Sequence, residues 1–165
     1  MPRETTCFVM MPFGKKPGAN GDLIDFDDVY QTVIAPVVTS LGLQSTRADE
    51  VPRAGSVHKD MLERIAGSDV VIVDITTGNP NVFYELGVRH ALRPRVTVLL
   101  KQRATAIPFD IAGLRLIDSE RSYKGVVAAQ QRLRQFIRNG LASESPDSLV
   151  YELLPALQVI LPPQP

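Results

Sequence analysis

The strongest constraint on the fold is the segment DVVIVDI at residues 69–75, where apolar residues follow one another without the alternation of a half-buried strand. A strand that is apolar on both sides has to be buried on both faces. Parallel sheets covered by helices provide that environment, because parallel strands need long crossover connections. The segment therefore predicts the central strand of an α/β sheet.

The rest of the chain alternates strand-like and helix-like segments around this run. A flavodoxin-like three-layer sandwich follows, with a five-stranded parallel sheet in the order 2-1-3-4-5. We expect a kink at Pro36 inside the helix 26–42 and an N-cap at Ser56 for the helix 56–68. We also expect a mobile loop at 14–22. The predicted strands are 7–13, 43–49, 69–75, 95–101 and 114–119, and the predicted helices are 26–42, 56–68, 80–92 and 124–142.

The domain organisation predicted from these elements is simple. Residues 1–143 form one α/β domain, and residues 144–165 form a carboxy-terminal extension with a short helix and a proline-rich end.

The charge balance limits the classes of partner. The 165 residues contain 18 Lys plus Arg and 18 Asp plus Glu, so the formal net charge is zero. Binding to nucleic acid or to a membrane surface relies on a basic excess, and we expect neither partner. No apolar run is long enough for a signal peptide or a membrane span, which predicts a cytoplasmic protein. His58 and His90 lack metal-ligand spacing, and no cofactor motif is present, so we expect no metal and no cofactor.

The order 2-1-3-4-5 also predicts where a ligand binds. In open parallel sheets the ligand lies beyond the carboxyl ends of the strands, where the strand order reverses. Here the reversal falls between the first and third strands, at the segments MMPFG (10–14) and DITTGNPN (74–81). The second strand brings Arg47 and Asp49 to the same edge. Lys15 and Lys16 follow the loop 11–14, and the helix that starts at Ser56 adds backbone N–H donors at the same edge. With these donors Arg47 binds an anion, most simply a nucleotide phosphate, or else it pairs with Asp49.

A polar stripe on the helix 80–92 lies at this predicted crevice. Asn81, Glu85 and Arg89 follow one another at four-residue spacing on a helix that otherwise reads as buried. Glu85 and Arg89 form either a solvated ion pair or part of an active site. Asp74 ends the central strand, where it either caps the following turn or acts in chemistry. Asn79 and Pro80 have the residue types of an N-cap and a first helical position.

These motifs together resemble a known family. The segments CFVMMPFG, RADE, VVIVDITTGNPNVFYELGVRHAL and IPFDI are similar to the bacterial TIR-like group related to nucleoside 2-deoxyribosyltransferases. More narrowly, they resemble the deoxyribohydrolase-like domain associated with apoptosis-signal-regulating-kinase-type proteins. The likeness runs from about Cys7 to Glu120, and NPNVFYELG is its most specific element. PDSLVYELLP also resembles the segment that follows this domain in bacterial multidomain members.

The resemblance implies an N-glycosidase that cleaves a nucleotide, nucleoside or NAD-like substrate, in signalling or defence. It implies Glu85 as the catalytic carboxylate and Asp74 as the group that holds the sugar or assists the leaving base. Such a carboxylate stabilises the positive charge that develops on the sugar or captures it covalently. The expected substrate-binding residues are Met11, Pro12, Phe13, Gly14, Arg47, Asp49, Thr76, Asn81 and Arg89.

Two alternatives remain open at this point. The same crevice could serve a non-catalytic nucleotide sensor or a TIR-like interaction module, and an electron carrier is a more distant third reading. In the related transferases, carboxy-terminal residues complete the pocket of a neighbouring subunit, and the matching residues are not found here. The sequence therefore leaves open whether the protein forms a homo-oligomer.

Overall fold

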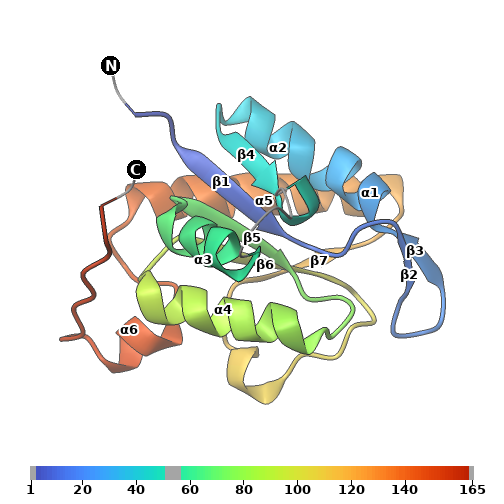
Figure 1. The fold of residues 1–165 in the computed structure, drawn as a ribbon. Helices are drawn as coiled ribbons and strands as arrows, with labels where there is room; N and C mark the ends of the chain where they lie inside the picture. The colour runs from blue at the N-terminus through green and yellow to red at the C-terminus, as the bar shows by residue number, and fades with distance from the viewer. Residues whose placement is uncertain (1–2, 51–56, 164–165) are drawn as a thin grey trace.

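The apolar run forms β5 (Val70–Asp74), whose five residues are all buried at the centre of a parallel sheet. The computed structural model describes residues 3–50 and 57–163 (Figure 1). The sheet order is β4-β1-β5-β6-β7, and every neighbouring pair is parallel. Counted along the chain without the two strands of a separate hairpin, this is the predicted order 2-1-3-4-5. The other sheet strands are β1 (Thr6–Met10), β4 (Gln44–Arg47), β6 (Thr97–Gln102) and β7 (Leu116–Ser119).

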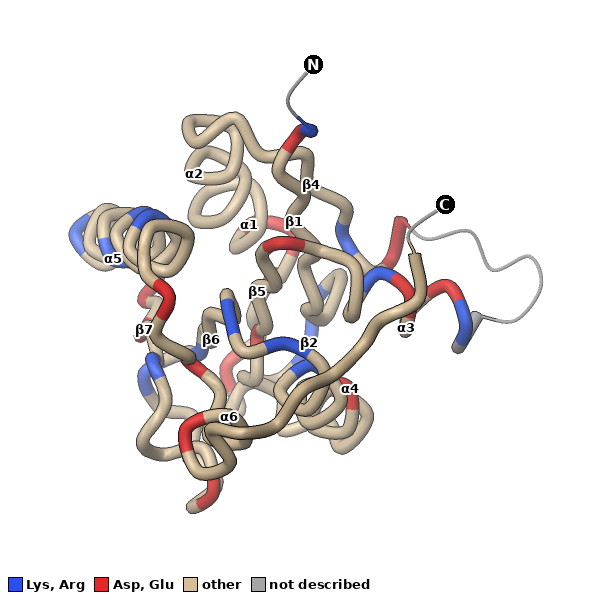
Figure 2. Tube along the Cα trace, turned by 90° about the vertical axis from the view of Figure 1, so that its left-hand side faces the viewer, with Lys and Arg blue, Asp and Glu red and all other residues tan. Residues whose placement is uncertain are grey.

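Helices cover both faces of the sheet, as the residues of β1 illustrate. Cys7 and Val9 belong to one buried apolar cluster, and Phe8 and Met10 belong to the other, because side chains alternate along a strand. Figure 2 shows α2 and α5 on one side of the strands and α3 and α4 on the other. The bounds of these four helices are α2 (Ala35–Ser40), α3 (Val57–Gly67), α4 (Pro80–Leu92) and α5 (Tyr123–Ala142). A short helix, α1 (Phe26–Val29), precedes α2.

The kink expected near Pro36 takes the form of a π-helical turn, Tyr30–Ile34, between α1 and α2. Pro36 has no N–H to donate to the carbonyl of Thr32, four residues earlier. That carbonyl instead accepts a hydrogen bond of 2.7 Å from Gln130 Nε2 of α5. The irregular turn thus attaches the first helical segment to α5. The cap predicted at Ser56 lies outside the described residues.

The segment predicted as a mobile loop forms a β-hairpin, so that prediction is wrong. Strands β2 (Lys15–Pro17) and β3 (Leu23–Asp25) pair antiparallel. The turn between them is closed by the Gly18 N–H, which donates to the Asp22 carbonyl at 2.8 Å, and Gly21 has a φ of 83°. In Figure 1 the hairpin extends beyond the carboxyl ends of the sheet strands.

The carboxy-terminal segment packs against α4 and the start of β6. It contains the expected short helix, α6 (Leu149–Leu153). Ser148 Oγ donates to the His90 carbonyl at 2.7 Å, and Tyr151 Oη donates to the Ala91 carbonyl at 3.1 Å. The Asp147 carboxylate accepts from the Thr97 N–H at 3.0 Å. These contacts place α6 at the end of α4 that is farthest from the hairpin (Figure 1).

Candidate functional site

A cleft lies where the strand order reverses, between the chain segments that leave β1 and β5. From β1 the chain continues into the hairpin and α1 on one face of the sheet, and from β5 it continues into α4 on the other. The two departing segments separate, which creates the crevice expected at this position. The cleft has a volume of about 590 Å³ and is lined by Met11, Pro12, Phe13, Lys16, Thr77, Gly78, Asn79, Pro80 and Val82.

The segment after β1 forms one wall of the cleft, as predicted for Met11, Pro12 and Phe13. Met11 is buried, whereas Phe13 is 46% exposed. Gly14 does not line the cleft. It has a φ of 66°, and its carbonyl accepts a hydrogen bond of 2.9 Å from the Phe26 N–H. Gly14 therefore turns the chain from the cleft wall into the hairpin.

The start of α4 forms the opposite wall. The Asn79 side chain accepts from the Asn81 N–H at 2.9 Å and Pro80 is in the first turn, which confirms the predicted N-cap and first helical residue. Gly78 has a φ of 63°, a conformation that a residue with a side chain rarely adopts. The side chain of Asn81 is exposed, and Asn81 does not line the cleft.

Thr76 is buried next to this wall and holds the end of β5 in place through hydrogen bonds. Its N–H donates to Asp74 Oδ1 at 2.9 Å, and its hydroxyl accepts from the Gln102 N–H at 3.0 Å. Thr76 is buried and is not among the residues that line the cleft. Its hydrogen bonds connect the end of β5 to the end of β6. The sequence had instead suggested that Thr76 contacts the substrate.

Asp74 is a buried carboxylate at the carboxyl end of the central strand. Its side chain is 1% exposed, and only one of its two oxygens is hydrogen-bonded: Oδ2 has no partner among the described residues. Burial raises the pKa of Asp74 from 3.8 to about 6, and the two hydrogen bonds from Thr76 oppose that change. A carboxyl group that titrates near neutral pH next to a cleft is typical of a proton-transferring site.

The raised pKa of Asp74 predicts a specific dependence of stability on pH. The folded protein binds this proton more tightly than the unfolded chain does, so its contribution is fully present below pH 3.8 and is lost as the pH rises through 6. The change amounts to about 3 kcal/mol at most. In urea titrations between pH 4 and pH 7, the free energy of unfolding of the wild type should fall relative to that of Asp74→Asn. A difference that does not vary with pH would show that Asp74 is ionised throughout.

Glu85 lies on α4, one helical turn beyond the residues that form the cleft wall. Its side chain is half-buried. Residues three apart on a helix share a face, so Glu85 lies on the side of α4 that carries Val82, which lines the cleft. A rise of 1.5 Å per residue puts its backbone about 4.5 Å farther along the helix axis. Glu85 is therefore near the cleft and outside its immediate lining.

Arg47 makes the ion pair that the sequence left open, together with a second one. Its Nε lies 2.6 Å from Asp49 Oδ1, and its Nη2 contacts Asp27 Oδ1 at the start of α1. The guanidinium is 5.2 Å from the centre of the Tyr30 ring, and the residue is 6% exposed. The hydrogen bond from Arg47 lowers the pKa of Asp27. Two carboxylates thus balance the charge of Arg47, and neither Arg47 nor Asp49 lines the cleft.

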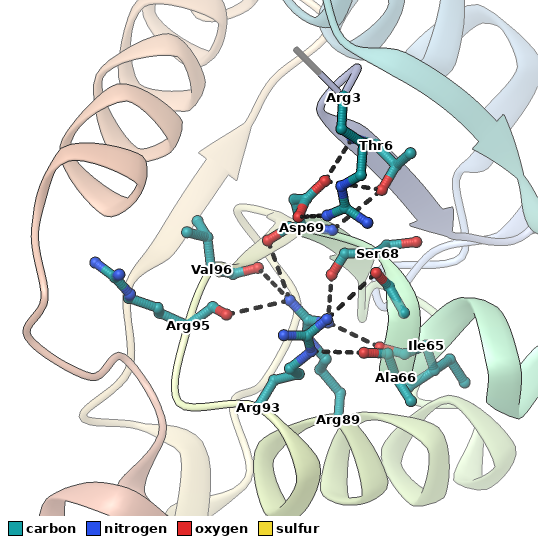
Figure 3. A network of polar contacts seen from close by, with 11 residues as sticks. Arg3, Thr6, Ile65, Ala66, Ser68, Asp69, Arg89, Arg93, Arg95 and Val96 are labelled. Atoms are coloured by element: carbon teal, nitrogen blue, oxygen red, sulfur yellow. Dashed lines mark hydrogen bonds and ion pairs between the residues drawn. The ribbon is translucent and has the colours of Figure 1, made fainter. Parts of the chain in front are cut away.

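Arg89 is the clearest correction to the sequence prediction, because its side chain lies in the interior of the protein and not in the crevice (Figure 3). Its Nη1 donates at 2.8 Å to the carbonyls of Ile65 and Ser68 at the end of α3, and its Nη2 donates at 3.1 Å to the carbonyl of Val96. These partners precede β5 and β6, at the amino edge of the sheet. Asn81 and Glu85 lie in the first half of α4, near the carboxyl edge of the sheet. Arg89 is four residues farther along the same helix and lies near the amino edge.

Lys16 was expected in a group of anion-binding donors with Arg47 and Lys15, and it is the one of the three that lines the cleft. Lys16 reaches the cleft from the hairpin, and its Nζ lies 5.5 Å from the centre of the Phe13 ring. A signal for the hairpin was present in the sequence, because Asn20-Gly21 lies between two short segments of strand-forming length. The remaining lining residues follow β5. Thr77, Gly78, Asn79 and Pro80 belong to the segment 74–81 that was expected at the crevice but were not named as substrate-binding residues, and Val82 was not predicted.

Neither a metal centre nor a membrane span emerges from the described residues. No group of three or more His, Cys, Asp or Glu side chains in residues 3–50 and 57–163 could hold a metal ion. No helix in that part of the chain is both long and apolar enough to cross a membrane. Compared with protein-family models and with curated proteins, the chain gives no match. The family resemblance of the motifs therefore stays a prediction.

Proposed function

We propose that this protein is an N-glycosidase-type enzyme that cleaves the bond between sugar and base in a nucleotide, nucleoside or NAD-like substrate. The observation that carries the proposal is Asp74: a buried carboxyl group at the end of the central strand, with a pKa of about 6 and one oxygen that has no hydrogen-bond partner in residues 3–50 and 57–163. Burying a carboxyl group with only part of its hydrogen-bonding capacity satisfied costs stability, and that cost is common where the group has a chemical task.

The chemistry assigns different tasks to the two carboxyl groups. As the bond from the anomeric carbon to the base nitrogen breaks, its electron pair leaves with the base and positive charge develops on the sugar. Glu85, as a carboxylate, stabilises that charge or bonds covalently to the anomeric carbon. Asp74, whose pKa of about 6 keeps part of the molecules protonated in mildly acidic to neutral solution, orients a sugar hydroxyl or protonates the departing base. Water then attacks the anomeric carbon and loses a proton, and where Glu85 had bonded covalently the water breaks that bond and releases the carboxylate, which completes hydrolysis.

Base release is the direct test of this proposal. The purified protein is incubated with NAD and with a panel of nucleotides and nucleosides in ribose and deoxyribose forms, and released bases are separated by chromatography. We expect at least one substrate to release its free base with a matching amount of free sugar or sugar phosphate. Release that is equal in protein-free controls for every compound would contradict the proposal.

A non-catalytic nucleotide sensor is the second candidate, and the composition of the cleft favours it. Within the described part of the chain, no carboxylate lines the cleft: Asp74 lies beneath the wall and Glu85 lies one turn beyond it. A sensor needs a ligand-shaped cleft but no carboxylate at the anomeric carbon. Saturable nucleotide binding without base release, unchanged by Glu85→Gln, would favour this reading over the enzyme.

A further inference from the structure

We infer that Lys16 of the hairpin, and not Arg47, recognises the phosphate of a nucleotide in the cleft, so that phosphorylated ligands bind more tightly than the corresponding nucleosides. This inference rests on the proposed function for the class of ligand. It deepens that function by naming the phosphorylated form as the preferred one.

The charge of the cleft supports an anionic ligand. Among the described residues that line it, Lys16 is the one that carries a formal charge. The ion pairs found within residues 3–50 and 57–163 do not include Lys16. Its ammonium group contacts the Phe13 ring, a weak interaction at an exposed site that leaves N–H donors for a ligand. Lys16 is thus an exposed cation in the cleft lining, and none of the described lining residues is a carboxylate that would compete for it.

The neutral side chains of Thr77 and Asn79 also line the cleft, but the other cation near it and the backbone N–H groups at the start of α4 are already engaged. Arg47 is paired with both Asp27 and Asp49, so a phosphate would have to displace two carboxylates from it. The start of α4 offers little, because the N–H groups of Asn81, Val82 and Phe83 all donate to oxygens of Asn79. The task of recognising a phosphate therefore falls to Lys16.

The hairpin is attached in a way that holds Lys16 at this place. The Phe26 N–H donates to the Gly14 carbonyl at 2.9 Å at the base of the hairpin, and Arg121 Nη1 donates to the Leu23 carbonyl at 3.1 Å on β3. Lys15, the preceding residue, pairs with Asp25 in the hairpin register and does not line the cleft. Successive side chains of a strand point to opposite faces, so Lys15 is a control of equal charge that is aimed elsewhere.

Equilibrium binding of defined probes tests the inference. Isothermal titration calorimetry is done at low salt with AMP, CMP, GMP and UMP, their deoxy forms and the matching nucleosides. We expect the wild type to bind at least one monophosphate about tenfold more tightly than its nucleoside, the size expected for one charge-assisted hydrogen bond. Lys16→Ala should remove this preference, whereas Lys15→Ala should keep it and Lys16→Arg should restore most of it. The preference should also weaken as salt is raised.

Three results would overturn the inference: no preference of the wild type for any monophosphate, a full preference in Lys16→Ala, or equal losses in Lys15→Ala and Lys16→Ala. Far-UV circular dichroism of each variant confirms that the fold is kept. Binding needs no turnover, so the outcome is separate from that of the base-release assay. A phosphate preference that depends on Lys16, without base release, would contradict the proposed N-glycosidase activity and support phosphate recognition by Lys16. Base release without a phosphate preference would support the activity and contradict the role of Lys16.

Discussion

Arg89→Met is expected to lower the free energy of unfolding by about 3–5 kcal/mol, enough to leave much of the protein unfolded at 37 °C. The substitution keeps an unbranched side chain of similar reach but removes every N–H donor. The buried carbonyls of Ile65 and Ser68 would then lose the bonds from Arg89, and each such group costs about 1–3 kcal/mol. The Val96 carbonyl would lose one of its two bonds and keep the one from the Val71 N–H. Urea denaturation followed by circular dichroism measures the loss.

Arg93→Met is the matched control for this prediction. Arg93 lies one turn farther along α4, is less deeply buried, and donates to the carbonyls of Ala66 at 2.6 Å and Gly67 at 3.3 Å (Figure 3). Because water can reach these groups more easily, we expect a loss of about 1 kcal/mol. If Arg89→Met were as stable as the wild type but no longer bound nucleotide, Arg89 would belong to the crevice after all.

Arg89 also shows what a sequence pattern can and cannot predict on this helix. The four-residue spacing of Asn81, Glu85 and Arg89 puts them on one stripe, and that part of the prediction follows from helix geometry. The stripe is about two turns long, however, and its ends meet opposite edges of the sheet. The open carbonyls at the end of α3 that bind Arg89 come from a segment more than twenty residues earlier. Only the three-dimensional arrangement reveals that partner.

The order of the main sheet could be predicted for a different reason. The residues 69–75 are apolar on both faces, which determines the central strand, and the helical segments on either side require parallel neighbours. The rule that ligands bind where the strand order reverses then led to Met11, Pro12 and Phe13, which do line the cleft. These predictions depend on periodicity and topology, which are properties of whole elements.

The hairpin escaped prediction because its strands are three residues each and carry weak strand signals. Lys15, Lys16 and Pro17 have low strand propensity, and Pro17 lacks an N–H. The pairing is stabilised by tertiary contacts, including the one between Phe26 and Gly14. Lys15 and Lys16 could therefore not be told apart in the sequence, although only the hairpin's register brings Lys16 to the cleft.

Glu85→Gln is expected to reduce the rate of base release by about 10²–10⁴-fold while leaving nucleotide affinity within about threefold of the wild type. The amide has nearly the same size and hydrogen-bonding reach as the carboxylate but carries no charge. It can neither stabilise a positively charged sugar nor form a covalent bond to the anomeric carbon. A loss confined to turnover is therefore the signature of a group that acts on the transition state.

Glu63→Gln provides the control, because it removes a carboxylate from the exposed surface of α3, where Glu63 lies 3.7 Å from Lys59. We expect this variant to release base at the wild-type rate, since an exposed pair of this kind contributes little and lies on another helix. Asp74→Asn tests the second carboxyl group: if Asp74 donates the proton, the variant should lose the decline in rate that the wild type shows as the pH rises through about 6. Full activity in Glu85→Gln would remove Glu85 from the mechanism, because no uncharged side chain at that position could replace the carboxylate.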